Sequence, residues 1–190
     1  MTTFIIEHCE PKVFLWCILE YTQMKKYVGK KNLFFTNVKK QEGKKLTSLG
    51  KVETKSVTKL NLENVCVLDP NAEQTLTPKD KFEYVVFGGI LGDAPARGRT
   101  KVVLTDKMKN VQTRNLTPFQ MSTDTAVLVT KLILDGTPIE KIPFQDTIEV
   151  VLKTRKFQES VILPYRYVLK NGKPLFNKKL VKYLAEKQSL

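Results

Sequence analysis

The chain has 190 residues, enough for one domain with a sizeable hydrophobic core. Its 32 lysines and arginines against 19 aspartates and glutamates give a formal net charge of +13. Such a charge favours association with nucleic acid or a ribonucleoprotein surface, although a lysine-rich proteome would give the same balance. No apolar run reaches the roughly 18 residues that span a bilayer, and the first residues do not form a signal peptide, so we expect no membrane association.

The cysteines and the histidine limit the redox and metal chemistry. Cys9, Cys17 and Cys66 are odd in number and lack metal-ligand spacing, which predicts reduced thiols and a cytoplasmic protein. His8 is the single histidine, so we expect no metal site.

The amino-terminal third predicts a strand, a helix and a second strand. Phe4–Ile6 is a short apolar run that ends in the polar group Glu7–Glu10, and Pro11 suits the first turn of a helix. Apolar side chains then recur at helical spacing until Gly29, which supplies a stop, and Leu33–Phe35 predicts the second strand. This order predicts a parallel pair of strands.

A lysine-rich stretch follows. Residues Asn37–Asn61 are predicted to form a surface excursion with a short helix at Leu46–Leu49. Val65–Leu68 predicts a strand closed by Asp69 and Pro70, and Thr77–Asp80 predicts a turn.

The central feature of the sequence is an apolar strand that ends in glycines. Tyr84–Phe87 predicts a buried strand, and it is followed by Gly88, Gly89 and Gly92. Glycines at the carboxyl end of a strand allow a sharp turn and close approach of a ligand, and in open α/β sheets ligands bind there. The GGxxG spacing and Pro95 do not match the dinucleotide fingerprint. A turn without a ligand is the alternative, but the basic Arg97–Arg99 tail favours a site.

The remaining elements alternate helix and extended chain. Lys101–Asn110 has a weak helical pattern, and Val111–Arg114 predicts a strand. Ser122 or Thr123 can cap a buried helix that ends at Asp135-Gly136, with Asp124 in its first turn.

The carboxyl-terminal part is predicted from pattern alone. Ile142–Asp146, Ile148–Leu152 and Val161–Leu169 predict extended segments, before a turn at Asn171–Pro174 and a short basic helix. Within the third segment, Tyr165–Tyr167 suits core packing and a salt bridge better than a substrate wall. No internal repeat or low-complexity linker is present, so we expect one domain over residues 1–190.

Four segments together resemble one known family. They are FIIEHCE at residues 4–10, FGGILGDAPARGRT at 87–100, QMSTDTAVLVTKLILDG at 120–136 and PYRYVL at 164–169. The chain resembles the SPOUT superfamily, and within it the arginine methyltransferases that use S-adenosylmethionine. The resemblance implies an α/β fold in which a mostly parallel sheet is flanked by helices, with a deep trefoil knot in the carboxyl-terminal half.

The resemblance also places the cofactor. S-adenosylmethionine would lie bent among three loops, at residues 87–93, 116–125 and 142–148, with the end of the Val65–Leu68 strand beside them. The implied cofactor-binding residues are Leu68, Asp69, Pro70, Phe87, Gly88, Gly89, Ile90, Leu91, Gly92, Met121, Ser122, Thr123 and Thr125. If Gly89 lines the cofactor, a valine there should block its binding.

The implied reaction calls for carboxylates. The guanidinium group of arginine stays protonated, so acidic side chains must hold it and help remove a proton. Asp93 is the first candidate for a catalytic residue and Glu7 the second. Arg97, Arg99 and Glu10 are candidates for substrate binding, although the two arginines also suit a solvated basic loop.

The eukaryotic branch of the family methylates an arginine of a small-subunit ribosomal protein and acts as a monomer. At Ala94–Gly98 this chain departs from the family's His-Pro-Pro-Arg-Asp pattern, a difference that bears on handling of the acceptor. Two other functions stay open from the sequence. One is an RNA methyltransferase acting on rRNA or tRNA, and the other is a non-catalytic module that binds the ribosome or RNA.

Overall fold

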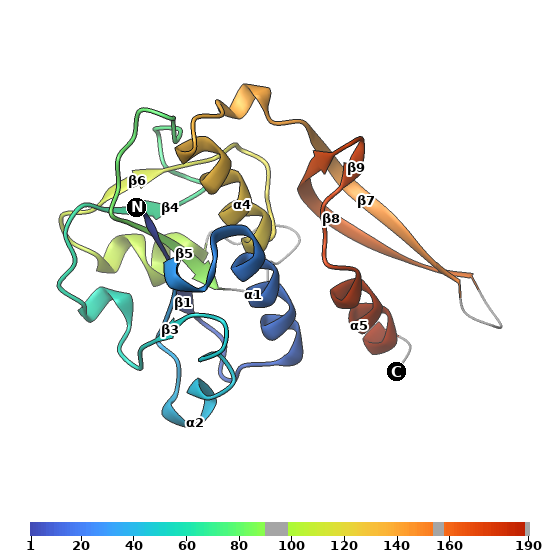
Figure 1. Cartoon of the computed structure of the whole chain (residues 1–190), viewed down its shortest axis with the longest axis horizontal. Helices are drawn as coiled ribbons and strands as arrows, with labels where there is room; N and C mark the ends of the chain where they lie inside the picture. Colours follow the sequence, from blue (N-terminus) through green and yellow to red (C-terminus); the bar gives the residue numbers. More distant parts are fainter. Residues whose placement is uncertain (90–98, 154–157, 189–190) are drawn as a thin grey trace.

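A six-stranded parallel sheet forms the body of the molecule in the computed structural model, which describes residues 1–89, 99–153 and 158–188 (Figure 1). The strand order is β3-β2-β1-β5-β4-β6, and every described pairing is parallel. The strands are β1 Thr3–His8, β2 Leu33–Thr36, β3 Lys51–Val52, β4 Val65–Leu68, β5 Tyr84–Gly89 and β6 Gln112–Arg114. The prediction of a mostly parallel sheet flanked by helices is confirmed.

The two central strands bring the predicted motifs together. In the pairing of β1 with β5, Glu7 lies opposite Gly88 and His8 opposite Gly89. Because all strands run in the same direction, the carboxyl ends of β1, β4 and β5 share one edge of the sheet, where α/β proteins bind ligands.

Helices cover both faces of the sheet. On one face lie α1 (Leu15–Val28) and α4 (Thr123–Leu134), which pack against each other (Figure 1). The other face is covered by the 3-10 turns η2 (Val57–Lys59) and η3 (Thr105–Lys107) and by α3 (Arg99–Val103). Alternate strand residues therefore enter two cores: Phe4, Ile6, Val85 and Phe87 face α1 and α4, whereas Ile5, Val67 and Val86 face the other layer.

A separate antiparallel sheet follows η4 (Ile139–Lys141). It contains β7 (Phe144–Lys153), β8 (Gln158–Lys170) and β9 (Lys173–Pro174), and the chain continues into α5 (Lys178–Gln188). Figure 1 shows this hairpin and α5 beside α1 and α4, away from the parallel sheet. The sequence predicted the extended segments but not their antiparallel pairing.

Two predictions for the amino-terminal half are wrong. Helix α1 begins at Leu15 rather than near Pro11, and the segment before it is held by a bond of 2.8 Å from the Val13 N–H to the Glu42 carboxylate. The short helix of the lysine-rich stretch is α2 at Lys40–Gly43, not Leu46–Leu49. The stretch is also more than a surface excursion, because it contains β3 and η2 and buries Leu46, Leu49 and Val57. A short 3-10 turn, η1 (Lys30–Asn32), precedes β2.

Other predictions are confirmed within one or two residues. Gly29 ends α1 with a φ of 79°, a conformation that favours glycine. The Thr77–Asp80 turn is closed by a main-chain hydrogen bond of 3.1 Å from the Asp80 N–H to the Thr77 carbonyl. Among the described residues, no helix has the length and apolar character needed to cross a bilayer.

Candidate functional site

A pocket of about 110 Å³ opens at the carboxyl ends of β4, β5 and β6. One wall is the start of α4, and another is the chain that joins β6 to it. The described residues that line the pocket are Leu68, Asp69, Pro70, Phe87, Gly88, Thr100, Arg114, Asn115, Leu116, Thr117, Phe119, Met121, Thr123 and Ala126.

Asp69 fixes the end of β4. Its carboxylate accepts hydrogen bonds from the Asn71 N–H at 2.9 Å and from the Thr105 hydroxyl at 2.7 Å, so it joins the loop after β4 to η3 on the far side of the sheet. The residue is buried, and both carboxylate oxygens have partners. Asp69 therefore shapes the pocket wall more than it offers a free charge to a ligand.

Asn115 fixes the neighbouring wall. Its side-chain amide donates to the Ala72 carbonyl at 2.6 Å and accepts from the Thr75 hydroxyl at 2.9 Å. Main-chain bonds to Gln74 and Leu76 continue the pairing. The loop after β4 is thereby fastened to the strand end that leads to α4.

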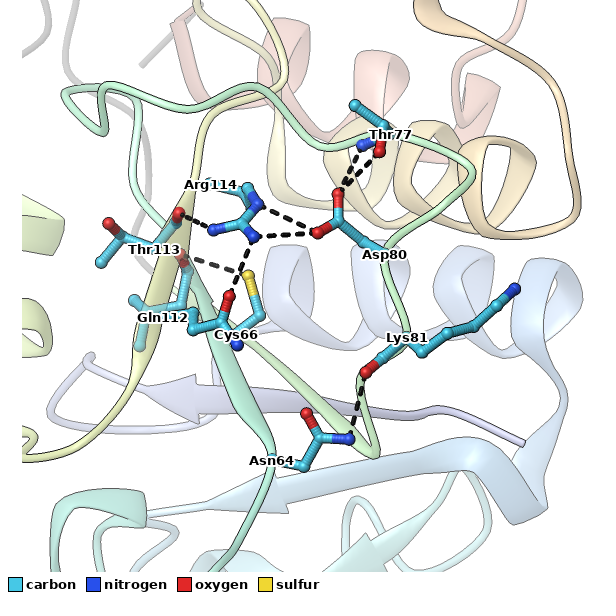
Figure 2. A network of polar contacts seen from close by, with 9 residues as sticks. Asn64, Cys66, Thr77, Asp80, Lys81, Gln112, Thr113 and Arg114 are labelled. Atoms are coloured by element: carbon cyan, nitrogen blue, oxygen red, sulfur yellow. Dashed lines mark hydrogen bonds and ion pairs between the residues drawn. The ribbon is translucent and has the colours of Figure 1, made fainter.

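Arg114, at the end of β6, joins this wall to the Thr77–Asp80 turn. Figure 2 shows its guanidinium on β6 facing Asp80, which it contacts through Nε at 3.2 Å and Nη2 at 2.9 Å. Asp80 also accepts from the Thr77 N–H at 2.8 Å. Burial acts to raise the pKa of Asp80, but the Thr77 N–H and the Arg114 guanidinium outweigh it, so the pKa lies below its ordinary value.

We expect Asp80→Asn to lower the free energy of unfolding by about 1–3 kcal/mol, because it leaves a mostly buried guanidinium without its counter-charge. A carboxylate with a lowered pKa stabilises the fold above its ordinary value of 3.8 and loses that contribution as the pH falls through the folded-state pKa. The difference from wild type should therefore shrink in acid when urea unfolding is measured across pH. Asp135→Asn, in the exposed Lys131–Asp135 pair, is the control and should cost less than about 1 kcal/mol.

The hairpin contacts the same loop through Arg166. Its guanidinium lies 3.7 Å from the Phe119 ring centroid and forms two bonds to Asp146, at 2.6 and 2.8 Å. Its main-chain N–H donates to the Gln120 carbonyl at 2.8 Å. The predicted salt bridge of this segment is confirmed, and it ties β8 to the loop that leads into α4.

The first turn of α4 borders the pocket. Ser122 is the N-cap residue, but its hydroxyl donates to Asp124 at 2.7 Å instead of accepting from the helix. Asp124 accepts from the Thr125 N–H at 3.0 Å, so its carboxylate pairs one of the N–H groups that have no partner within the first turn of the helix. The Thr123 hydroxyl reaches the Gly88 carbonyl at 3.4 Å, which brings the two predicted motifs into contact.

The structure gathers seven of the predicted cofactor residues around the pocket: Leu68, Asp69, Pro70, Phe87, Gly88, Met121 and Thr123. Gly89, Ser122 and Thr125 do not line it. Ile90, Leu91, Gly92, Asp93 and Arg97 lie outside the described residues, as does the side chain of Arg99, whose backbone begins α3. Of the three implied loops, residues 142–148 contribute nothing to the described lining, because β7 begins there.

Glu7 occupies a structural position. It is 2% exposed, and Oε2 accepts from the Thr36 hydroxyl at 2.5 Å and from the Val57 N–H at 2.9 Å. It thus anchors the lysine-rich stretch to the sheet, on the face opposite α1. Glu10 lies half-buried in the loop after β1.

Sequence reasoning did not single out Thr100, Arg114, Asn115, Leu116, Thr117, Phe119 and Ala126, although three of them fall in the implied loop 116–125. The sequence did predict that a strand ends at Arg114, and that strand end was the available signal. The structure places it beside the end of β4.

The lining suits S-adenosylmethionine. Leu68, Phe87 and Met121 offer apolar surface to a flat base, while Thr100, Thr117 and Thr123 offer hydroxyls to polar groups. Among the described residues, no cluster of three or more histidine, cysteine or acidic side chains could hold a metal ion.

A pocket at the strand ends of a parallel sheet is where open α/β folds bind ligands. The sheet and its flanking helices match the fold of solved SPOUT-type enzymes. A dual-specific Trm10 from Thermococcus kodakaraensis has this fold, with a TM-score of 0.60 at 17% identity over 74% of this chain and 96% of its own.

The whole chain is similar to a narrower group. The family model described as protein arginine N-methyltransferase SFM1-like matches residues 3–189. The Saccharomyces cerevisiae protein arginine N-methyltransferase SFM1 is 39% identical over 192 residues, covering 90% of this chain and 89% of the yeast protein. The structure of yeast arginine methyltransferase SFM1 complexed with SAM has a TM-score of 0.86 at 36% identity, covering 100% of this chain and 92% of that one. The chain belongs to the SFM1-like family, and the predicted methyltransferase class and S-adenosylmethionine cofactor are confirmed.

Proposed function

We propose that the protein transfers a methyl group from S-adenosylmethionine to an arginine side chain of a small-subunit ribosomal protein. Family membership supports the arginine acceptor. The observation that carries the proposal is the pocket at the ends of β4, β5 and β6, where Gly88 and Thr123 from the two most specific motifs meet.

The cofactor supplies the electrophile when bound: the acceptor nitrogen forms the new N–C bond, the S–C electron pair returns to sulfur, and one N–H proton leaves the nitrogen. The chain's own residues bind and orient. Phe87 and Met121 offer apolar contact, and Thr123 at the positive end of α4 suits a carboxylate. Holding both reactants in line is the main contribution that such a site can make.

The acceptor needs carboxylates within reach of its guanidinium. Asp93 follows the glycine cluster and stays our proposal for one of them. Glu7 is a weaker candidate than the sequence indicated, because Thr36 and Val57 already occupy its Oε2.

The charge distribution supports a ribosomal partner. Between residues 26 and 59 the acidic residues are Glu42 and Glu53, whereas ten lysines have exposed side chains. They are Lys26, Lys30, Lys31, Lys39, Lys40, Lys44, Lys45, Lys51, Lys55 and Lys59. A surface of this kind is attracted to RNA phosphates that surround a ribosomal protein. The three cysteines are free, which supports a cytoplasmic location, and we propose that the enzyme acts as a single-domain monomer.

We also infer the deep knot of the family. Residues 115–122 start at the edge strand β6 and end at α4, which packs on α1 and β5. This path passes the carboxyl ends of β4 and β5, which line the same pocket, and membership of the family supports the knot.

Radiolabelled S-adenosylmethionine and small ribosomal subunits test the proposal. We expect the label in one ribosomal protein, in an arginine, and a rate that falls as salt rises because phosphate contacts are screened. Replacing Lys39, Lys40 and Lys44 with glutamate should weaken the salt dependence and lower the rate on subunits. Label in RNA would instead support the RNA methyltransferase, and cofactor binding without any transfer would support the non-catalytic module.

A further inference from the structure

A second cavity, of about 220 Å³, lies between α1, α4, the β8 strand and α5. Its floor holds two carboxylates, Glu20 from α1 and Asp124 from α4. Its walls are apolar and aromatic: Val161, Ile162, Leu163, Pro164, Tyr165, Tyr167, Phe176, Leu180, Val181 and Leu184, with Ser122 and Asn177 as polar members. Ile162 is 63% exposed, whereas its neighbours Val161 and Leu163 are buried.

Glu20 is the unusual group. It is only 7% exposed, yet no hydrogen-bond donor among the described residues reaches its carboxylate. Asp124, 4% exposed, is bonded through Oδ1 to the Ser122 hydroxyl and the Thr125 N–H. Burial, and then the charge of Asp124, raise the pKa of Glu20 well above its ordinary value, and burial also raises that of Asp124.

No lysine or arginine is among the described residues that line this cavity. Two buried acidic groups without a cation are costly, because burial disfavours the charged form of each and the two repel one another. A folded protein gains nothing in stability from that arrangement. The cost is recovered when a cation enters and bonds to both carboxylates.

The cavity suits a guanidinium better than an ammonium. A guanidinium is planar, donates in parallel pairs to carboxylates, is weakly hydrated and stacks on aromatic rings. Glu20 and Asp124 share the cavity with three aromatic residues, Tyr165, Tyr167 and Phe176. The volume is several times the roughly 30 Å³ that one water occupies.

This cavity and the cofactor pocket share one wall. Met121 and Thr123 line the cofactor pocket, while Ser122 and Asp124, which alternate with them, line the carboxylate cavity. The two cavities therefore meet at residues 121–124, where the chain enters α4. No other carboxylate is among the described residues lining either pocket except Asp69, whose two oxygens already have partners.

We propose that Glu20 and Asp124 bind the guanidinium of the acceptor arginine and present it to the cofactor pocket. The inference rests on the proposed function, and it assigns the acceptor site to α1 and α4 rather than to Glu7. Binding orients the nitrogen, and a carboxylate of the pair then takes the N–H proton that leaves as the N–C bond forms. The proton passes on to solvent, because methylarginine itself stays protonated.

The first test is binding without methyl transfer, by calorimetry with N-acetyl-arginine amide. Wild type should bind the probe at millimolar concentration. Because the bound cation favours the ionised form of carboxyls whose pKa is raised, binding should release protons. Proton release is detected when the measured heat of binding changes with the ionisation enthalpy of the buffer. N-acetyl-lysine amide should bind more weakly. Glu20→Gln should abolish both the arginine-selective binding and the proton release, and Glu20→Asp should keep part of each. Glu63→Gln, exposed in the loop before β4, is the matched control and should behave as wild type.

The second test separates this role from a structural one. Glu20→Gln should raise the melting temperature at neutral pH and leave it nearly unchanged below the ordinary glutamate pKa of 4.5. The reason is that a buried carboxyl with a raised pKa destabilises the folded protein increasingly as the pH rises above 4.5, and glutamine cannot ionise. Affinity for S-adenosylmethionine should stay the same, while kcat/KM on the protein acceptor falls on the order of 10²–10³-fold.

Unchanged probe binding in Glu20→Gln, or a wild type that does not bind the probe, would overturn the proposal even if ribosomal protein is methylated. A large loss of melting temperature at neutral pH in Glu20→Gln would also overturn it, since that would make Glu20 a structural residue. Conversely, Glu20-dependent binding of the probe would support the acceptor site even if the ribosomal substrate proved wrong.

Discussion

Ala126→Phe is expected to lower the affinity for S-adenosylmethionine by roughly 10–100-fold and to remove most methyl transfer at low cofactor concentration. Ala126 lies on the first turns of α4, half-buried, where it lines the pocket of about 110 Å³ that we propose for the cofactor. A phenyl ring there occupies the space that the cofactor needs, and displacing it into strained rotamers costs about 1–3 kcal/mol. Isothermal calorimetry with the cofactor measures the change.

The control is Val102→Phe on α3, where the side chain is 64% exposed and the same ring meets solvent. It should bind the cofactor as wild type does. The fold of Ala126→Phe should be retained, because the added ring fills a cavity. Wild-type cofactor affinity in a folded Ala126→Phe variant would show that the cofactor lies elsewhere.

Gly89→Ala is expected to destabilise the fold by about 1–3 kcal/mol, or roughly 2–12 °C in melting temperature, while the folded fraction binds cofactor normally. A Cβ at this position would lie 2.9 Å from the Glu7 carbonyl oxygen, the Ile6 Cγ2 and the Tyr21 hydroxyl. The Tyr21 hydroxyl is itself 2.9 Å from His8 Nδ1, which limits its movement. Valine at Gly89 should cost more for the same reason.

Urea unfolding of Gly89→Ala beside Gly43→Ala measures this effect. At Gly43, in α2, an added Cβ would be 3.6 Å from Val52, an ordinary contact, and alanine favours a helix. Gly43→Ala should therefore be neutral or stabilising. Equal stabilities for the two variants would contradict the packing role of Gly89.

That contrast shows how far the sequence could go. A glycine at a strand end was interpreted as room for a ligand, yet Gly88 lines the pocket and its neighbour Gly89 faces the opposite way, against β1 and Tyr21. Successive residues of a strand point to opposite faces, and the sequence does not state which face holds the ligand. The glycine motif was recognisable, but which of its glycines lines the pocket and which packs in the core was not.

The parallel sheet was largely predictable because its strands are short apolar runs with clear ends, such as Val65–Leu68, which the structure reproduces residue for residue. The β7–β8 hairpin was not, because strand pairing depends on contacts between distant residues and on a turn that has no distinctive sequence. Glu20 was missed for a related reason. The sequence of α1 predicts that Glu20 faces solvent, and Glu20 is buried only because β8 and α5 pack beside it.

The two cavities differ in when they can exist during synthesis. The described residues that line the cofactor pocket lie between positions 68 and 126, whereas those around the Glu20–Asp124 cavity extend from 20 to 184. A growing chain thus possesses every one of the former before β8 and α5 have left the ribosome. Domains are made from the amino terminus onward, so the proposed acceptor site is the last part to be assembled. An incomplete chain could therefore form the pocket at the strand ends while the Glu20–Asp124 cavity still lacks the walls that β8 and α5 supply.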